Sequence, residues 1–231
     1  MFSACQYGSV DNTGTRADSD STTIHIAVLP TEECQPFYVA QQRGLYDSLG
    51  ISVCLDTFFA AMDADTAFMN NQVQLLVSDS LKARYLNSMA QKDSIVSIIS
   101  DTLRLSMMTG KPTRIKSINS LKEKIIAVTR NSAIDYFADQ TMDKAKIKRE
   151  YLNRPQINNI ALRADMLNLN QFDGAILPEP FATQCEALGA YRINSTKEPL
   201  MRVLVKSSVM KKRKQDIQKI IEAYSIAKHV E

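Results

Sequence analysis

The sequence predicts an α/β fold of two lobes, each a mainly parallel sheet flanked by helices, with a ligand cleft between the lobes. Two observations predict it. Short β-branched runs alternate with helical segments along the chain, which is the pattern of parallel strands joined by crossover helices. The two halves also echo each other: NQVQLLVSD at 71–79 matches NQFDGAILPE at 170–179. Each is a polar turn, a buried strand and a carboxylate just past the strand's end.

The composition is that of an ordinary globular protein. The chain has 231 residues, 45% of them hydrophobic and 23% charged, and can fold without a disulfide or a metal. A net charge of +3 is too small and too dispersed to predict a nucleic-acid partner. The four cysteines form no CxxC pair, and His25 and His229 lie far apart in sequence, so we expect no metal site and no cofactor.

The amino terminus has two interpretations. Residues 1–5, MFSAC, resemble the end of a bacterial lipoprotein signal, in which Cys5 carries the lipid, but the basic and apolar regions of such a signal are missing. The alternative is a chance cysteine near a disordered start. Because residues 6–21 are polar and poor in apolar side chains, we expect 1–21 to be a disordered tether.

The first half of the chain reads as alternating strands and helices. We expect strands at 23–29, 51–57, 73–77 and 94–100, and helices at 37–47, 63–70 and 81–89. Gly44 is expected to end the first helix, and Ser80 to cap the third. No window reaches the roughly 18 apolar residues of a membrane span.

The second half continues the alternation. We expect strands at 124–129, 157–161, 172–177, 191–194 and 202–206, and helices at 133–144, 163–169, 181–188 and 215–230. We divide the folded part into one lobe of 22–105 plus 207–231 and a second lobe of 106–206.

Four segments, taken in order, carry a family resemblance. They are IAVLPTEECQPFYVAQQRGLYDSLGISV from residue 26, NNQVQLLVSDS from 70, SLKEKIIAVTRNSAIDYF from 120, and FDGAILPEPFATQCEALG from 172. Together they resemble the type II periplasmic solute-binding proteins of the nitrate, sulfonate/taurine and thiamine-precursor group. The fourth segment is the most specific. Glu123 stands where the family usually has Gly, and Gln74 where it usually has Asp.

The resemblance implies a type II periplasmic-binding-protein fold and a role in transport. The chain would be a non-enzymatic, extracytoplasmic solute-binding component of an ABC importer, located in the periplasm or cell envelope. It would act as a monomer that passes a small-molecule solute to a permease and ATPase complex. Its contact with the membrane would be the lipid at Cys5 only.

Loops at the carboxyl ends of strands predict the binding site, because ligands of open α/β sheets lie there. The residues expected to bind the solute are Glu33, Gln35, Phe37, Tyr38, Ser78, Asp79, Arg130, Asn131, Ser132, Tyr136, Glu179 and Phe181. The aromatic rings could stack on a planar solute. Other roles stay open: Tyr38 facing the core, Glu179 fixing its own turn, and Arg130 neutralising a carboxylate across the cleft.

Charge favours one class of solute. The loops carry several carboxylates and a single cation, Arg130, and a carboxylate accepts hydrogen bonds from an amine but repels an anion. We therefore expect an amine-bearing or heterocyclic solute, similar to a thiamine precursor. The alternatives are a sulfonate, taurine or nitrate binder, a sensor domain, and a pyrimidine-biosynthesis enzyme on the same fold. The resemblance implies that such an enzyme needs an iron-binding histidine and clustered cysteines.

Overall fold

The computed structural model describes residues 22–90 and 93–229, so the predicted tether and Cys5 lie outside the described residues. These residues form one seven-stranded sheet in the order β2-β1-β3-β7-β4-β6-β5. The strands are β1 Ile24–Val28, β2 Val53–Thr57, β3 Leu75–Asp79, β4 Ile95–Thr109, β5 Ile126–Ala127, β6 Gly174–Pro178 and β7 Tyr191–Lys206. Strand β1 pairs in parallel with β2 and β3, and β5 pairs in parallel with β6.

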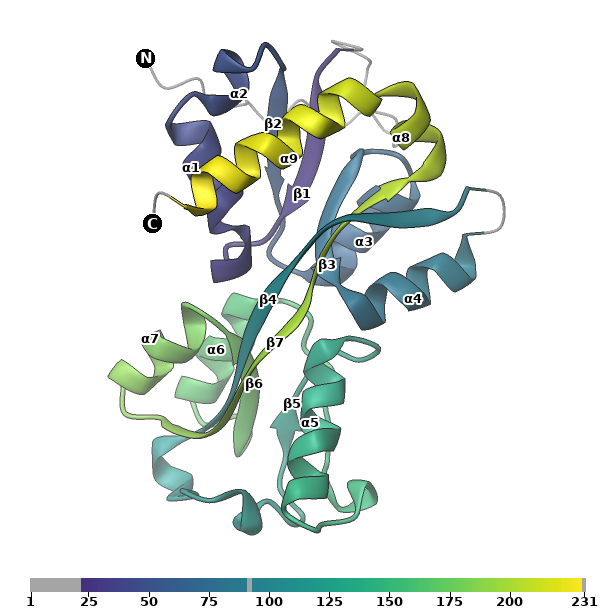
Figure 1. Ribbon diagram of the computed structural model, residues 1–231. Coiled ribbons are helices and arrows are strands. Elements are labelled where there is room, and N and C mark those ends of the chain that lie inside the picture. The colour runs from purple at the N-terminus through teal and green to yellow at the C-terminus, as the bar shows by residue number, and fades with distance from the viewer. Residues whose placement is uncertain (1–21, 91–92, 230–231) are drawn as a thin grey trace, which may run out of the picture.

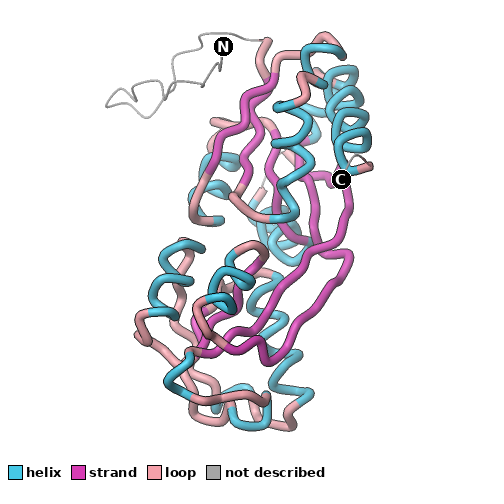
Figure 2. The backbone as a smooth tube through the Cα atoms, turned by 90° about the vertical axis from the view of Figure 1, so that its left-hand side faces the viewer, coloured by secondary structure: helices cyan, strands magenta, loops and turns pink. Residues whose placement is uncertain are grey.

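Two long strands join the two ends of the molecule. β4 and β7 pair antiparallel over almost their whole length and run from the upper to the lower group of helices (Figures 1 and 2). The prediction of separate short strands at 94–100, 191–194 and 202–206 is therefore wrong in extent. Pro199 suggests a break in the strand. The structure accommodates it at a register shift, where Asp101 pairs with Met201 and Leu103 with Glu198.

The upper group of helices in Figure 1 combines both ends of the described chain. It contains α1 Gln35–Gln42, α2 Leu45–Ser48, α3 Ala61–Met69, α4 Ser80–Met89, α8 Ser207–Lys212 and α9 Lys214–Lys228. Helix α9 packs against α1, where the rings of Phe37 and Tyr224 lie 5.0 Å apart. Gly44 separates α1 from α2 with a φ of 66°, which glycine adopts at little cost.

The lower group contains α5 Ala133–Lys144, α6 Ile160–Asn168 and α7 Phe181–Ala187. Short 3₁₀ helices lie in the connecting segments, at Glu32–Cys34, Lys111–Thr113, Ile118–Ser120 and Arg149–Tyr151. The strand expected at 157–161 is not formed, because α6 begins at Ile160 and Asn159 caps it by accepting the Leu162 N–H. Asn153 and Gln156 instead make isolated bridges beside β5.

Asp79, rather than the predicted Ser80, caps α4. Its Oδ1 accepts the backbone N–H groups of Leu81 and Lys82, each at 2.9 Å. A carboxylate also complements the positive end of the helix better than a hydroxyl does. This cap fixes the Asp79 side chain at the carboxyl end of β3.

Two further features of the described residues concern membrane spans and cysteines. In this part of the chain no helix has the length and apolar character needed to cross a membrane. Cys34, Cys54 and Cys185, the cysteines of the described residues, have buried side chains and form no disulfide with one another.

Candidate functional site

A small cavity lies where the two groups of elements meet. It has a volume of about 60 Å³. Its polar lining comes from Glu33, Asp65, Ser78, Asp79, Lys82, Thr129, Ser132 and Asn158, and its apolar lining from Leu29, Ala61, Val77, Leu103, Leu105, Ile134, Ile160 and Pro178. The carboxyl ends of β3 and β6 thus meet at one cavity, as the echo between 71–79 and 170–179 predicts.

The cavity is small because backbone contacts join the upper and lower groups of elements on both sides of it. On one side Glu32 donates its N–H to the carbonyl of Glu179 at 2.8 Å. On the other, Ile160 donates to the carbonyl of Phe59 at 3.0 Å, and Ala60 forms an antiparallel bridge with Asn159. Ligand pockets usually hold roughly 300–1,000 Å³. The structure is therefore a closed form, in which this cavity has too little free volume for a molecule of more than a few atoms.

Asp79 lies between the amino termini of α4 and α5, on opposite sides of the cavity. Its carboxylate caps α4 on one side, and on the other it lies close enough to the backbone N–H of Ala133, the first residue of α5, for that group to lower the pKa of Asp79. Burial raises the pKa of Asp79, while the N–H groups of Lys82, Ala133 and Leu81 act against that shift. Two helix amino termini therefore converge on one carboxylate, an arrangement that stabilises negative charge.

Glu33 is the second carboxylate of the cavity. Burial raises the pKa of Glu33 from 4.5 to about 7, partly offset by its own backbone N–H and by the Thr31 hydroxyl. Repulsion from Glu32 and Asp79 adds to the increase in pKa. Near neutral pH this side chain therefore exchanges between a proton donor and a hydrogen-bond acceptor.

A buried ion pair completes the charged lining. Lys82 Nζ lies 3.0 Å from Asp65 Oδ2, and the two side chains are 7% and 10% exposed. Burial raises the pKa of Asp65, and the Lys82 ammonium opposes the shift. Neither residue was predicted, because both lie inside helices rather than in strand-end loops. Lys82 is three residues beyond Asp79, which places it in the first turn of α4.

Side-chain hydrogen bonds hold the loop that follows β5. Ser132 donates its hydroxyl to the Thr129 carbonyl at 2.6 Å, and Thr129 Oγ1 accepts from Arg163 Nη1 at 2.7 Å. Arg163 is fully buried, and burial lowers its pKa to about 10. Its Nε and Nη2 have no hydrogen-bond partner among the described residues. Arg163 thus holds the Thr129 side of the cavity without lining it.

The structure brings four of the residues predicted to bind the solute to this cavity: Glu33, Ser78, Asp79 and Ser132. Two of the predicted aromatic residues make their contacts outside the cavity. Phe37 is fully buried against Tyr224, and the Tyr38 hydroxyl donates to the Leu29 carbonyl at 3.3 Å. The predicted residues that lie outside the lining are Gln35, Phe37, Tyr38, Arg130, Asn131, Tyr136, Glu179 and Phe181.

Two predicted charged residues have partners outside the cavity. Glu179 accepts from Arg192 at 2.6 Å and from the Thr183 hydroxyl at 2.8 Å, so its carboxylate holds its own turn. Arg130 is exposed and donates to the Arg154 carbonyl at 3.2 Å. The lysine of the buried pair, not Arg130, is therefore the cation in the lining.

With this geometry in view, the sequence identifies the family. The model of the family described as NMT1/THI5 like matches residues 31–227. The chain belongs to this family. No curated protein matches the chain. The resemblance to the nitrate, sulfonate and thiamine-precursor group is thereby confirmed.

Solved structures give the fold of this NMT1/THI5-like chain. The alkanesulfonate-binding protein SsuA of Xanthomonas axonopodis pv. citri, bound to MOPS, matches with a TM-score of 0.78 and 13% identity over 90% of this chain and 74% of that chain. The nitrate-binding protein NrtA of Synechocystis PCC 6803 matches at 0.79 and 11%, over 90% and 61%. PhnD1 of Prochlorococcus marinus MIT 9301, in complex with methylphosphonate, matches at 0.66 and 10%, over 89% and 88%. The predicted two-lobed periplasmic-binding-protein fold is confirmed.

Proposed function

We propose that the chain is the extracytoplasmic solute-binding component of an ABC importer. The family, the fold and a cavity enclosed between two groups of elements support this function. In this role it works as a monomer in the periplasm or cell envelope, is tethered by a lipid at Cys5, and delivers its solute to a permease and ATPase. It performs no chemistry on the solute.

The proposed lobes are 22–105 plus 207–231 and 106–206. The packing of α9 on α1 supports the return of the carboxyl-terminal segment to the first lobe. The register shift around Asp101 and Leu103 lies near the proposed boundary on β4. β4 and β7 are then the two connections about which the lobes open and close. Because residues 201–205 of β7 pair with β3 of the first lobe, the crossing in β7 lies near Pro199 rather than at residue 206.

The solute we propose is amine-bearing and heterocyclic, similar to a thiamine precursor. The observation that carries this proposal is the charge of the cavity: Glu33, Asp65 and Asp79 face one ammonium, that of Lys82. Because Lys82 is paired with Asp65, the two remaining carboxylates favour hydrogen-bond donors and cations. The apolar lining, with Leu29, Leu103 and Ile134 among it, suits the faces of a ring.

An anionic solute is the second candidate, and one observation favours it. Asp79 occupies the amino terminus of α5, where a sulfonate or nitrate could take its place if the carboxylate moved aside. The similar structures named for an alkanesulfonate, nitrate and methylphosphonate are consistent with this alternative. A pyrimidine-biosynthesis enzyme is a weaker third candidate, because neither His25 nor His229 is in the cavity lining.

Thermal shift followed by calorimetry distinguishes the solute classes. We expect an aminopyrimidine to raise the melting temperature by mass action, and taurine and nitrate to leave it unchanged. Asp79→Asn, which removes the charge, should weaken aminopyrimidine binding at least about tenfold, since a hydrogen bond to a charged group contributes about 1.5–3 kcal/mol. Asp63→Asn, on the exposed side of α3, is the matched control and should bind as the wild type does.

Tight binding of taurine or nitrate without a response to the aminopyrimidine would reject the amine-bearing solute. It would leave the solute-binding role in place. If none of the solutes bound and the purified protein processed a pyrimidine precursor instead, the transport role itself would be wrong.

A further inference from the structure

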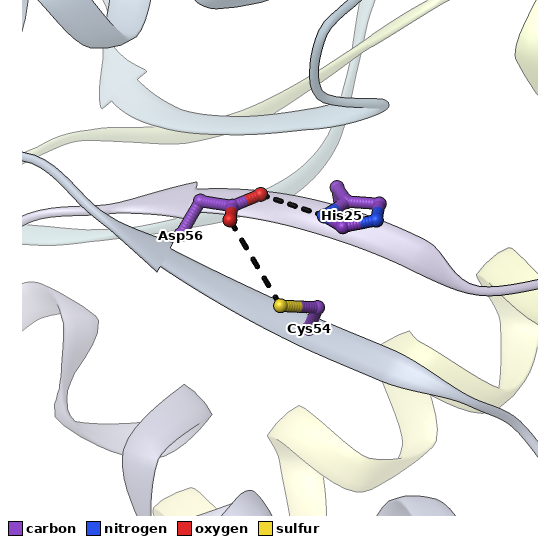
Figure 3. Close-up of side chains that lie close together, drawn as sticks. All are labelled: His25, Cys54 and Asp56. Carbon is purple, nitrogen blue, oxygen red and sulfur yellow. Dashed lines mark hydrogen bonds and ion pairs between the residues drawn. The ribbon is translucent and has the colours of Figure 1, made fainter. Parts of the chain in front are cut away.

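A second cluster of polar side chains lies on the outer strands of the sheet, apart from the cleft lining. His25 of β1 is the register partner of Cys54 on β2, and Asp56 follows on the same face of β2 (Figure 3). One potential ligand atom from each side chain lies within 4.8 Å of the other two. The sequence alone predicts no metal site, because His25 is 29 residues from Cys54. Parallel pairing of the strands removes that separation.

Asp56 already contacts the other two side chains. His25 Nδ1 lies 2.8 Å from Asp56 Oδ2, and the Cys54 thiol donates to Asp56 Oδ1 at 3.9 Å, so the carboxylate stands between the other two groups (Figure 3). The side chains of His25 and Asp56 are 23% and 17% exposed, whereas Cys54 is 4% exposed. An ion could therefore reach the cluster from solvent while the sulfur stays shielded.

The donor set selects the kind of metal. Sulfur, imidazole nitrogen and carboxylate oxygen are the three ligand types of zinc sites. Magnesium and calcium prefer oxygen ligands alone, so the thiol disfavours them. Zinc–ligand bonds of about 2.0–2.3 Å at tetrahedral angles place ligand atoms roughly 3.3–3.8 Å apart, so side-chain rotations must adjust the present separations, which reach no more than 4.8 Å.

We propose that His25, Cys54 and Asp56 form a zinc-binding site that clamps β2, the edge strand, to β1. On binding, the Cys54 sulfur loses its proton to solvent as the zinc–sulfur bond forms, His25 coordinates as the neutral imidazole, and Asp56 coordinates as the carboxylate. Water occupies the fourth position on the exposed side. Because the three ligands come from paired strands, the site is preorganised by the sheet.

Calorimetric titration of the full-length chain with zinc chloride tests the site. A Cys5→Ser background removes the one thiol outside the described residues. We expect one zinc per chain and a zinc-dependent rise in melting temperature. His25→Gln and Cys54→Ser should each weaken binding at least about 100-fold, since loss of a direct ligand exceeds the 10–100-fold effect of an outer-shell partner. His229→Gln, exposed directly after the last residue of α9, is the matched control and should bind zinc like the parent.

Equal zinc affinity in Cys54→Ser and the parent would overturn the proposal. If a variant fails to fold, X-ray absorption on the zinc-loaded parent gives the answer without a substitution. We expect one sulfur among nitrogen and oxygen ligands. A shell of nitrogen and oxygen only, or the absence of bound zinc, would overturn the proposal equally.

Discussion

Glu33 shows how the closed cleft changes the chemistry of a single side chain. Its pKa of about 7 means that the folded protein holds this proton more tightly than the unfolded chain does. The contribution of Glu33 to the free energy of unfolding is therefore complete below the ordinary pKa of 4.5 and is lost as the pH rises through about 7.

Comparison with Glu33→Gln isolates this titration. The free energy of unfolding of the wild type, relative to the variant, should fall by up to about 3 kcal/mol between about pH 4.5 and pH 8, at about 1.4 kcal/mol per pKa unit. Urea unfolding at several pH values measures the difference. A difference that stays constant with pH would contradict the raised pKa.

The site residues that sequence reasoning can find are those in strand-end loops. Glu33, Ser78, Asp79 and Ser132 line the cavity and were all predicted to bind the solute. Lys82 and Asp65 were not, because charged residues inside helices are usually solvated, and only the tertiary packing of α3 and α4 buries this pair. Phe37 looked suitable for stacking, but the docking of α9 buries it in the core.

At the scale of elements, Asp79 has two functions that substitution can separate. It caps α4 through two backbone N–H groups and supplies negative charge to the cavity. Asparagine caps helices about as well as aspartate, whereas alanine does not. The two replacements therefore differ in their effect on folding but share the loss of charge.

We expect Asp79→Ala to lower the free energy of unfolding by about 1 kcal/mol, within the 0.5–2 kcal/mol that a lost cap costs. Asp79→Asn should lower it by less while weakening solute binding to a similar extent. Denaturant unfolding and calorimetry on both variants measure the two effects. Equal loss of stability in both variants would mean that the cap is not what Asp79 contributes to folding.

The strands that sequence reasoning mispredicts are the ones that depend on distant pairing. β-branched alternation locates β1, β2 and β3 to within a few residues. The segment 101–109 and the Pro199 region carry weak local signals, and they become strand because β4 and β7 satisfy each other's backbone groups. The segment 157–161 shows the opposite error, because a strand is predicted there and none forms. Asn159 caps the start of α6 instead of continuing a strand.

At the scale of the whole molecule, the internal echo predicts two similar lobes but not the state in which they rest. Closure depends on contacts between segments that are distant in sequence, such as Phe59 with Ile160 and Glu32 with Glu179. The central claim is that a solute binds between the lobes and enters only when these contacts open. A reversible lock across the cleft tests this claim directly.

Ala60→Cys combined with Asn159→Cys supplies such a lock. The two residues pair in an antiparallel bridge, where Cα atoms lie about 4.5–5.5 Å apart, within the range that disulfides require. Each single variant serves as a control. We predict that the oxidised double variant fails to bind, in calorimetry, the solute that the wild type binds, and that reduction restores binding. Undiminished binding by the oxidised protein would contradict a site between the lobes.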